Sequence, residues 1–354
     1  MGIFIALYCG FILIYLVSLS ITNEKQKRIF SCITCFLILW IVQALRSSSI
    51  GTDVGRAYKL VFESVSTDFN SLFILTHRAS FEPGYEIYEQ IIKIFISSNI
   101  NVFLGITSAL ILLPISYIIY KYSKNCILSF IIFSGLIIYH FSFSGLRQSL
   151  AIGIIFFSLK YIIEQKPIKF ITCVLLAASF HTSAIIFLAM YPIRNFNLTG
   201  IRSFIIFLIW IPCIFALKNI AIYLSAAIFG AEKYASYFSQ GNAYNLMILF
   251  FVIYILAVNL KSTDKTYLIY KQAALFALLA QSFGLISDGA TRIGYYFIIF
   301  MILLIPYMIN NYLKNPTTRN MISFSVAILS AAFFFYIAGG GYLEVIPYKF
   351  FWEN

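Results

Sequence analysis

Residues 141–151 read FSFSGLRQSLA, and Arg147 is the only formally charged residue between Lys124 and Lys160. The surrounding apolar run is too long for one membrane crossing, so it predicts two helices that meet near Gly145. An arginine at such a turn lies at or just inside the lipid interface. Because an unpaired guanidinium at that depth costs several kcal/mol, Arg147 is a candidate functional residue. A snorkelling interfacial arginine is the alternative interpretation.

The composition extends this pattern to the whole chain. Its 354 residues are 61% hydrophobic and 11% charged, whereas soluble domains carry about 25% charged residues. Apolar runs recur from end to end, so we expect an all-α, polytopic integral membrane protein with one transmembrane domain over residues 1–354 and about 12 spans. The predicted spans are residues 3–21, 29–45, 102–120, 126–143, 145–163, 170–193 (as two halves), 203–217, 246–260, 267–287, 294–313 and 321–338.

The longest polar region, residues 46–101, is predicted to be an extracytoplasmic loop. Within it, residues 85–96 place Ile87, Ile91 and Phe95 at helical spacing, beside Glu86 and Glu89. This pattern indicates an amphipathic helix lying in the membrane interface.

The run of residues 170–193 decides the topology, because His181 lies in its middle. If residues 179–182 break the run into two half-crossings, fifteen of the 25 Lys and Arg residues and three of the 13 acidic residues face the cytoplasm. Ten basic and ten acidic residues then face outward. A single span would instead place the later basic loops outside, against the positive-inside rule. We therefore predict a broken or re-entrant pair around His181.

This topology places a set of polar residues on one, outward-facing side of the membrane. Irregular backbone at membrane depth is tolerated where it lines a cavity, so the set predicts a two-signed polar site in the outer leaflet. Its members are Arg46, Asp53, Glu82, Arg147, His181, Asp288 and Arg292. The three histidines, His77, His140 and His181, are dispersed, and we expect no metal site, no cofactor and no nucleic-acid partner.

Several short motifs in a fixed order resemble the EpsG family, whose members are Wzy-like polymerases of bacterial exopolysaccharide, capsule and O-antigen. The likeness covers most of the chain. Its motifs are Arg46 with Gly51-Thr-Asp53 and Tyr58, Phe81-Glu-Pro-Gly-Tyr85, Gly145-Leu-Arg-Gln148, Phe180-His-Thr-Ser-Ala184, Arg292 with Tyr295-Tyr-Phe297, and Pro347-Tyr-Lys-Phe-Phe351.

The resemblance implies a GT-C-like glycosyltransferase in the bacterial cytoplasmic membrane. Such an enzyme transfers a growing glycan from undecaprenyl diphosphate to another lipid-linked repeat unit on the outer face. Undecaprenyl-diphosphate-linked oligosaccharides and the lipid bilayer are the implied partners, with a flippase and a chain-length regulator beside them. The lack of a glycine-rich phosphate loop agrees with a lipid-linked donor rather than a nucleotide sugar.

The reaction needs cations on the departing diphosphate and a base for the acceptor hydroxyl. Candidate substrate- and diphosphate-binding residues are Arg147, Arg292, Arg46, Gln148 and Asp288, of which Asp288 is also a candidate ion-pair partner of an arginine. Candidate bases are Asp53, Glu82 and His181. Asp53 ranks first among the bases, with capping of a helix at Val54 as its alternative role.

Two other functions fit a polytopic chain. A flippase or other transporter of lipid-linked oligosaccharide should show repeat symmetry between its halves, and none is evident. A membrane O-acyltransferase uses a histidine reached from inside, whereas His181 is predicted to face outward. Lipid-linked units in a deletion strain discriminate these functions: single repeats displayed outside indicate a missing polymerase, and units trapped inside a missing flippase.

Overall fold

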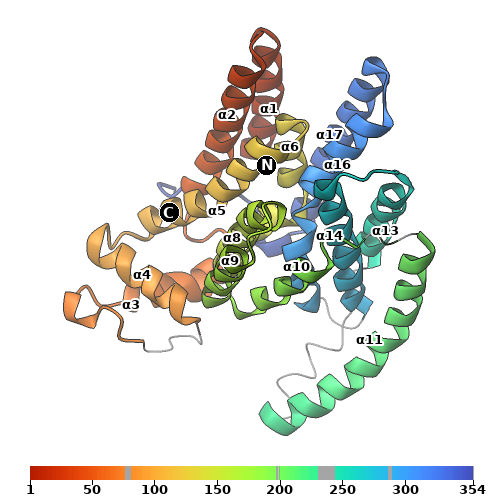
Figure 1. The fold of residues 1–354 in the computed structure, drawn as a ribbon. Coiled ribbons are helices and arrows are strands. Elements are labelled where there is room, and N and C mark those ends of the chain that lie inside the picture. Colours follow the sequence, from red (N-terminus) through yellow and green to blue (C-terminus); the bar gives the residue numbers. More distant parts are fainter. Residues whose placement is uncertain (76–80, 197, 199, 230–243, 286–288, 354) are drawn as a thin grey trace. The chain divides into compact units, whose positions relative to one another are not determined.

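The computed structural model is helical and describes residues 1–354 except 76–80, 197, 199, 230–243, 286–288 and 354 (Figure 1). No β-strand occurs among the described residues, in which the backbones of Arg46 and Phe350 form an isolated antiparallel bridge. The chain separates into two compact units. The first comprises Met1–Ile186 and Ile309–Asn354, and the second is Phe187–Met308.

The prediction of an all-α membrane protein is confirmed, because six described helices are long and apolar enough to cross a bilayer. A seventh candidate is a pair of helices bent by 46°, Ala290–Ile298 and Met301–Tyr312. Shorter apolar helices accompany them, and the count of 12 spans and the GT-C-like architecture stay predictions. The six helices are α1 (Gly2–Leu19), α2 (Glu24–Ala44), α5 (Ile100–Tyr122), α8 (Leu146–Ile163), α14 (Lys265–Gln281, extended to Leu285 by η6, Ser282–Leu285) and α17 (Pro316–Gly339).

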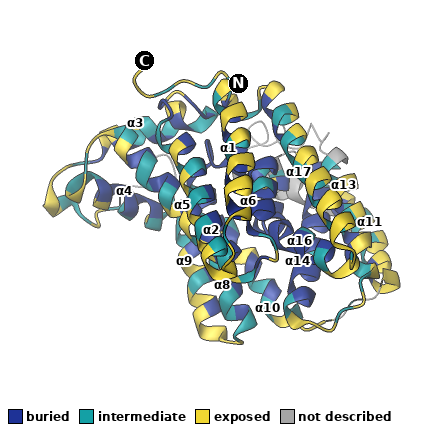
Figure 2. Cartoon of the chain, turned by 90° about the horizontal axis from the view of Figure 1, so that it is seen from above, coloured by how far each residue is buried: buried dark blue, intermediate teal, exposed yellow. Residues whose placement is uncertain are grey.

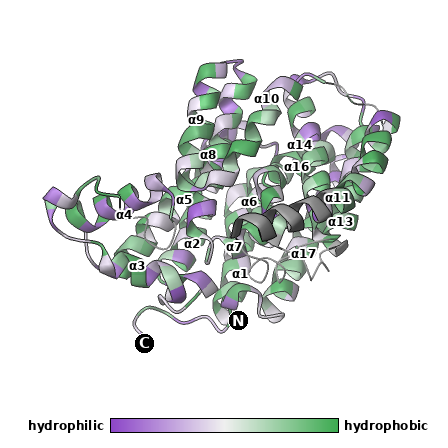
Figure 3. Cartoon of the chain, turned by 90° about the horizontal axis from the view of Figure 1, so that it is seen from below, coloured by the Kyte–Doolittle hydropathy of each residue, from purple (hydrophilic) through white to green (hydrophobic). Residues whose placement is uncertain are grey.

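The first unit is a stack of long helices. α8 packs against α5 and α9 (Pro167–Phe180), α5 packs against α2, and α2 packs against α1 (Figure 1). α17 lies along α6 (Cys126–Gly135). The outer sides of α1 and α17 are both exposed and apolar, as Figures 2 and 3 show. Leu13 and Leu329, for example, are 63% and 67% exposed. Such faces are suited to lipid rather than water.

The predicted span 126–143 is wrong in one respect, because the structure interrupts it. α6 ends at Gly135, and α7 (Ile137–Phe141) starts after the extended Leu136. A Cβ atom on Gly135 would lie 2.4 Å from the Ser330 carbonyl oxygen. The glycine therefore lets α17 approach at the break, a tertiary contact that the local sequence does not announce.

The predicted helix at residues 85–96 is present as α4 (Pro83–Phe95), with Pro83 in its first turn. Its two faces are the reverse of those of a water-soluble helix. Glu86 and Glu89 are 4% and 1% exposed, whereas Ile91 and Phe95 are 40% and 59% exposed. The carboxylates face the protein and the apolar stripe faces outward, as an interfacial helix requires. Before α4 come η1 (Val54–Tyr58), α3 (Lys59–Ser64) and η2 (Phe69–Ser71).

The run of residues 170–193 is interrupted where the charge distribution predicts. α9 ends at Phe180, and His181 adopts extended backbone angles, with φ −156° and ψ 110°. A 3₁₀ segment, η4 (Thr182–Ala189), follows.

In the second unit, α14 packs against α13 (Tyr244–Asn259), α10 (Met190–Ile193), η7 (Gly289–Gly294) and α15 (Tyr295–Ile298). The predicted span 203–217 extends further here, as α11 (Gly200–Phe229). The predicted span 294–313 is divided between α15 and α16 (Met301–Tyr312). The Phe187 ring packs against Phe297 of α15 and against Phe300, which lies in the break between the two helices.

Candidate active site

Four of the sequence motifs converge in the first unit, and side-chain contacts join them in series. Arg147 at the start of α8 forms an ion pair with Glu82, which precedes α4. The same carboxylate contacts His181 at the end of α9. The hydroxyl of Tyr58, from η1, lies 3.5 Å from Arg147 Nε. We call Glu82, Arg147, His181 and Tyr58 the Glu82 cluster.

The motif Phe81-Glu-Pro-Gly-Tyr85 explains how Glu82 reaches this position. Pro83 begins α4, which leaves Glu82 in the extended conformation at its N-terminal end. Gly84 lies against the C-terminal end of α9, since a Cβ atom there would fall 2.4 Å from Ser179 Oγ and 2.7 Å from the Ser179 carbonyl oxygen. Only glycine allows this approach, which brings Glu82 to the residues that follow Ser179.

Both carboxylate oxygens of Glu82 are occupied. Oε2 pairs with Arg147 Nη1, and Oε1 lies 3.0 Å from His181 Nδ1. The backbone N–H of Thr182 donates to the same Oε1 over 3.1 Å. The guanidinium of Arg147 also stacks on the Phe81 ring, 4.3 Å from its centroid. These contacts hold the arginine and the imidazole on either side of one carboxylate.

The electrostatics of the cluster favour an ionised Glu82. Burial by itself raises the pKa of Glu82, but hydrogen bonds from His181 and the Thr182 backbone, with the charge of Arg147, lower that pKa to about 2. Burial also raises the pKa of the Tyr58 hydroxyl, and Arg147 lowers it in part. The side chains of Glu82, Arg147 and His181 are 14%, 21% and 28% exposed. The cluster is therefore shielded from bulk water and still reachable by a substrate.

Asp53 forms a second pair beside the cluster. Gly51 has φ +93°, and a Cβ atom on it would lie 2.1 Å from the Phe143 carbonyl oxygen. This approach places Asp53 against Ser144, whose hydroxyl donates to Asp53 Oδ2 and accepts from the Asp53 N–H, each over 3.1 Å. The carboxylate makes no capping hydrogen bond to η1, so the structure gives no support to the capping role.

Arg46 is completely buried beside Phe143. Its guanidinium lies 5.0 Å from the Phe143 ring centroid, and none of its three nitrogens has a hydrogen-bond partner within the described part of the chain. Burial lowers the pKa of Arg46 to about 10. The tail covers this region, because the N–H of Ser47 donates to the Lys349 carbonyl over 2.9 Å and that of Phe351 to the Leu45 carbonyl over 3.0 Å.

Three predicted site residues remain to be placed. Gln148 is buried on α8, and Arg292 is exposed on η7 of the second unit. Asp288 lies outside the described residues. Their roles stay predictions. In the described ranges, no group of three or more His, Cys, Asp or Glu residues could hold a metal ion.

Sequence reasoning alone assigned no site role to three contributors. Phe81 stacks on Arg147, Thr182 donates its N–H to Glu82, and Ser144 pairs with Asp53. Each is a motif residue or the immediate neighbour of one. The motif glycines at positions 51, 84 and 145 are therefore the sequence signal that could have pointed to these residues.

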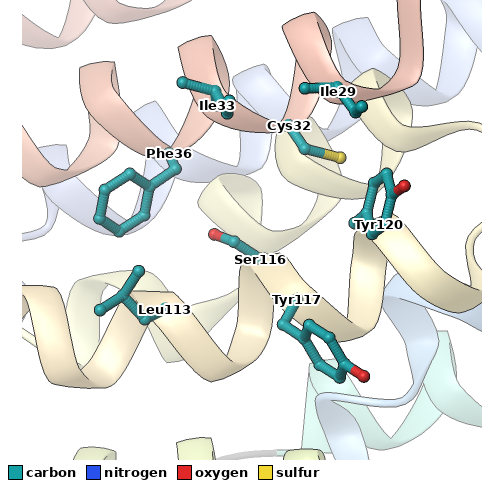
Figure 4. Close-up of a pocket in the computed structure, with 8 residues that line it drawn as sticks. All are labelled: Ile29, Cys32, Ile33, Phe36, Leu113, Ser116, Tyr117 and Tyr120. Atoms are coloured by element: carbon teal, nitrogen blue, oxygen red, sulfur yellow. The ribbon is translucent and has the colours of Figure 1, made fainter. Parts of the chain in front are cut away.

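A groove between α2 and α5 is separate from the cluster and shares no residue with it (Figure 4). Its volume is about 330 Å³. It carries no charged side chain, and its position between two candidate spans suits an acyl chain rather than chemistry. It is lined by Ile29, Cys32, Ile33, Phe36, Leu113, Ser116, Tyr117 and Tyr120.

Comparison with known families agrees with the resemblance found in the sequence. The model of the EpsG family matches residues 28–350, nearly the whole chain. The chain belongs to the EpsG family. Membership of the EpsG family indicates an exopolysaccharide-related, glycosyltransferase-like polymerase. Searches of curated proteins and of solved structures gave no match.

Proposed function

We propose that this protein is a polysaccharide polymerase that transfers a growing glycan from undecaprenyl diphosphate to the hydroxyl of a lipid-linked repeat unit. The reaction takes place on the outer face of the bacterial cytoplasmic membrane. One observation carries the proposal: the family's motifs bring Arg147, Glu82 and His181 into a single half-buried cluster.

Arg147 is the group that holds the diphosphate. A guanidinium presents a planar fork of donors that matches phosphate oxygens, and it stays charged when it is partly buried. Phe81 stacks on its face and Tyr58 contacts its edge, so the fork is held in one orientation. Positive charge fixed in place before the reaction stabilises the negative charge that develops on the leaving diphosphate.

The outward orientation of the cluster is part of the proposal and is supported by the distribution of charged residues. Glu82 belongs to the predicted extracytoplasmic loop, and α9 ends at the predicted interruption next to His181. A lipid-linked substrate would reach the cluster from the interface, where α4 presents its apolar stripe.

The test is polymer formation from lipid-linked repeat units by purified protein in nanodiscs, followed as a ladder of products on a gel. Arg147→Lys keeps the charge but loses the fork, so we expect the polymerisation rate to fall about 10²-fold or more. Arg56→Lys is the matched control, because Arg56 is an exposed arginine paired with Glu344 over 3.1 Å. An unchanged ladder from well-folded Arg147→Ala protein would rule out the diphosphate role.

A further inference from the structure

We propose that Glu82 and His181 act as a dyad, in which Glu82 orients the imidazole and His181 Nε2 takes the proton of the acceptor hydroxyl. The inference rests on the proposed glycosyl transfer and deepens it by assigning the base. It also changes the order of the candidates, since Asp53 ranked first on sequence alone.

The hydrogen-bond geometry defines which imidazole nitrogen is available. Glu82 Oε1 lies 3.0 Å from His181 Nδ1 and already accepts the N–H of Thr182. An ionised carboxylate can only accept hydrogen bonds, so Nδ1 must carry the hydrogen. In a neutral imidazole the other nitrogen, Nε2, is then an acceptor. Nε2 has no hydrogen-bond partner among the residues that the structure describes.

The same contacts make Glu82 a poor base. Arg147 holds Oε2, while His181 and the Thr182 N–H hold Oε1. With a pKa of about 2, the carboxylate has little affinity for a proton at neutral pH. A general base works best when its affinity for protons suits the working pH, and imidazole as a group titrates there.

Backbone structure fixes the imidazole in place. α9 stops at Phe180, and the His181 N–H donates to the Ala177 carbonyl over 2.9 Å. The Thr182 N–H then reaches the carboxylate that holds the ring. The imidazole is thus held at the backbone and at Nδ1, and its side chain remains 28% exposed. A base needs this combination of a fixed ring and an open nitrogen.

The step is balanced as a single displacement. The acceptor O–H bond breaks, its proton passes to His181 Nε2, and the oxygen's electron pair forms a bond to the anomeric carbon of the donor. The bond between that carbon and the diphosphate oxygen breaks, and its electron pair leaves with the diphosphate opposite Arg147. The Glu82 carboxylate stabilises the imidazolium that results, which afterwards gives its proton to solvent.

Charged and titratable groups surround His181. Glu82 contacts the ring directly, and Arg147 contacts Glu82 from α8. Other titratable side chains lie on the elements packed against His181 and on its own helix: Tyr85, Glu86, Tyr88, Glu89 and Lys93 of α4, Lys160 and Tyr161 of α8, and Lys169 and Cys173 of α9. Glu82 is the carboxylate in direct contact with the ring, so its removal should leave the imidazole without the acceptor that orients Nδ1.

The experiment measures kcat and KM from pH 5 to 9 for His181→Asn, Glu82→Gln and Asp53→Asn in nanodiscs. The amide nitrogen of the new asparagine can still donate to Glu82, but no atom replaces Nε2. We expect kcat of His181→Asn to fall about 10²- to 10⁴-fold with KM little changed. Glu82→Gln should lower kcat with KM little changed, because a neutral amide no longer stabilises the imidazolium that forms. Glu344→Gln is the control, because that exposed carboxylate pairs with Arg56 outside the cluster.

Three outcomes overturn the dyad: His181→Asn with more than a tenth of wild-type kcat, Glu82→Gln with wild-type kcat, or a larger loss in Asp53→Asn than in His181→Asn. If His181→Asn does not fold, kcat and KM of Glu82→Gln decide alone. Wild-type protein that makes no polymer overturns the proposed function itself, so the two failures are distinguishable.

Discussion

Gly84→Ala tests whether the close approach of α4 and α9 assembles the Glu82 cluster. The added Cβ atom would lie 2.7 Å from the Ser179 carbonyl oxygen, whereas ordinary contact begins at 3.4 Å, so the two elements must separate by about 0.7 Å. Glu82 is only two residues from Gly84. If the shift passes to its carboxylate, the distance from Oε1 to His181 Nδ1 grows from 3.0 Å to about 3.7 Å, beyond hydrogen-bonding range.

Two effects should follow from this displacement. Misplacement of a catalytic group by about 1 Å costs about 10²-fold in rate, so polymerisation should fall by that order. Overpacking should lower the free energy of unfolding by about 1–3 kcal/mol, with a small gain from the better helix propensity of alanine set against it. The assays are the product ladder in nanodiscs and thermal unfolding in detergent.

Gly105→Ala is the matched control, because its Cβ atom would lie an ordinary 3.7 Å from the Ala44 Cβ. Ser179→Gly should not rescue Gly84→Ala, since the conflicting carbonyl belongs to the backbone. Wild-type polymerisation by Gly84→Ala protein would refute the steric reasoning and remove the link between the Phe81-Glu-Pro-Gly-Tyr85 motif and the cluster.

Acid should lower the free energy of unfolding of the wild-type protein more than that of Glu82→Gln. The reason is that the pKa of Glu82 falls from its ordinary value of 4.5 to about 2 on folding. This stabilisation is present above pH 4.5 and is lost as the pH falls toward 2. The pKa shift sets an upper limit of about 3 kcal/mol, and screening by water reduces the stabilisation to about 1–2 kcal/mol. The free energies of unfolding of wild type and Glu82→Gln, measured between pH 3 and 7, test this contribution of Glu82. Parallel curves of stability against pH would exclude it. The predicted topology is tested by cysteines introduced at Asn70 and Ser262 after removal of the native cysteines. A membrane-impermeant reagent added from outside should label only position 70, and labelling at 262 would contradict the broken-helix topology.

The spacing of apolar residues and the distribution of basic residues predict the helices of this fold better than the contacts between them. The helix at residues 85–96 and the interruption at His181 follow from apolar spacing and from the balance of basic loops, both of which are local or additive. The break at Leu136 depends on α17, almost 200 residues later, and has no local signal.

The candidate site shows the same division. The chemistry of Arg147, Glu82 and His181 makes each of them a candidate from the sequence. Arg147 and His181 lie 65 and 99 residues from Glu82, however, so the sequence does not show that both contact its carboxylate. Asp53 ranks first among the candidate bases on sequence because its short motif favours either a base or a helix cap. Its partner, Ser144, is an ordinary serine 91 residues away that only the folded chain identifies.

The backbone bridge between Arg46 and Phe350 of the C-terminal tail has a consequence for biogenesis. The Tyr348 hydroxyl donates to the Val42 carbonyl across 306 residues of sequence, close in the chain to the bridge between Arg46 and Phe350. At about 5–20 residues per second, a ribosome needs roughly 15–60 s to supply the missing partner. Throughout that interval the first motif, with Gly51 and Asp53, lacks the segment that contacts it in the finished chain. Synthesis that stops before residue 347 therefore yields a chain with most of its apolar helices but without the tail contacts of Ser47 and Val42, a product suited to recognition by membrane quality control.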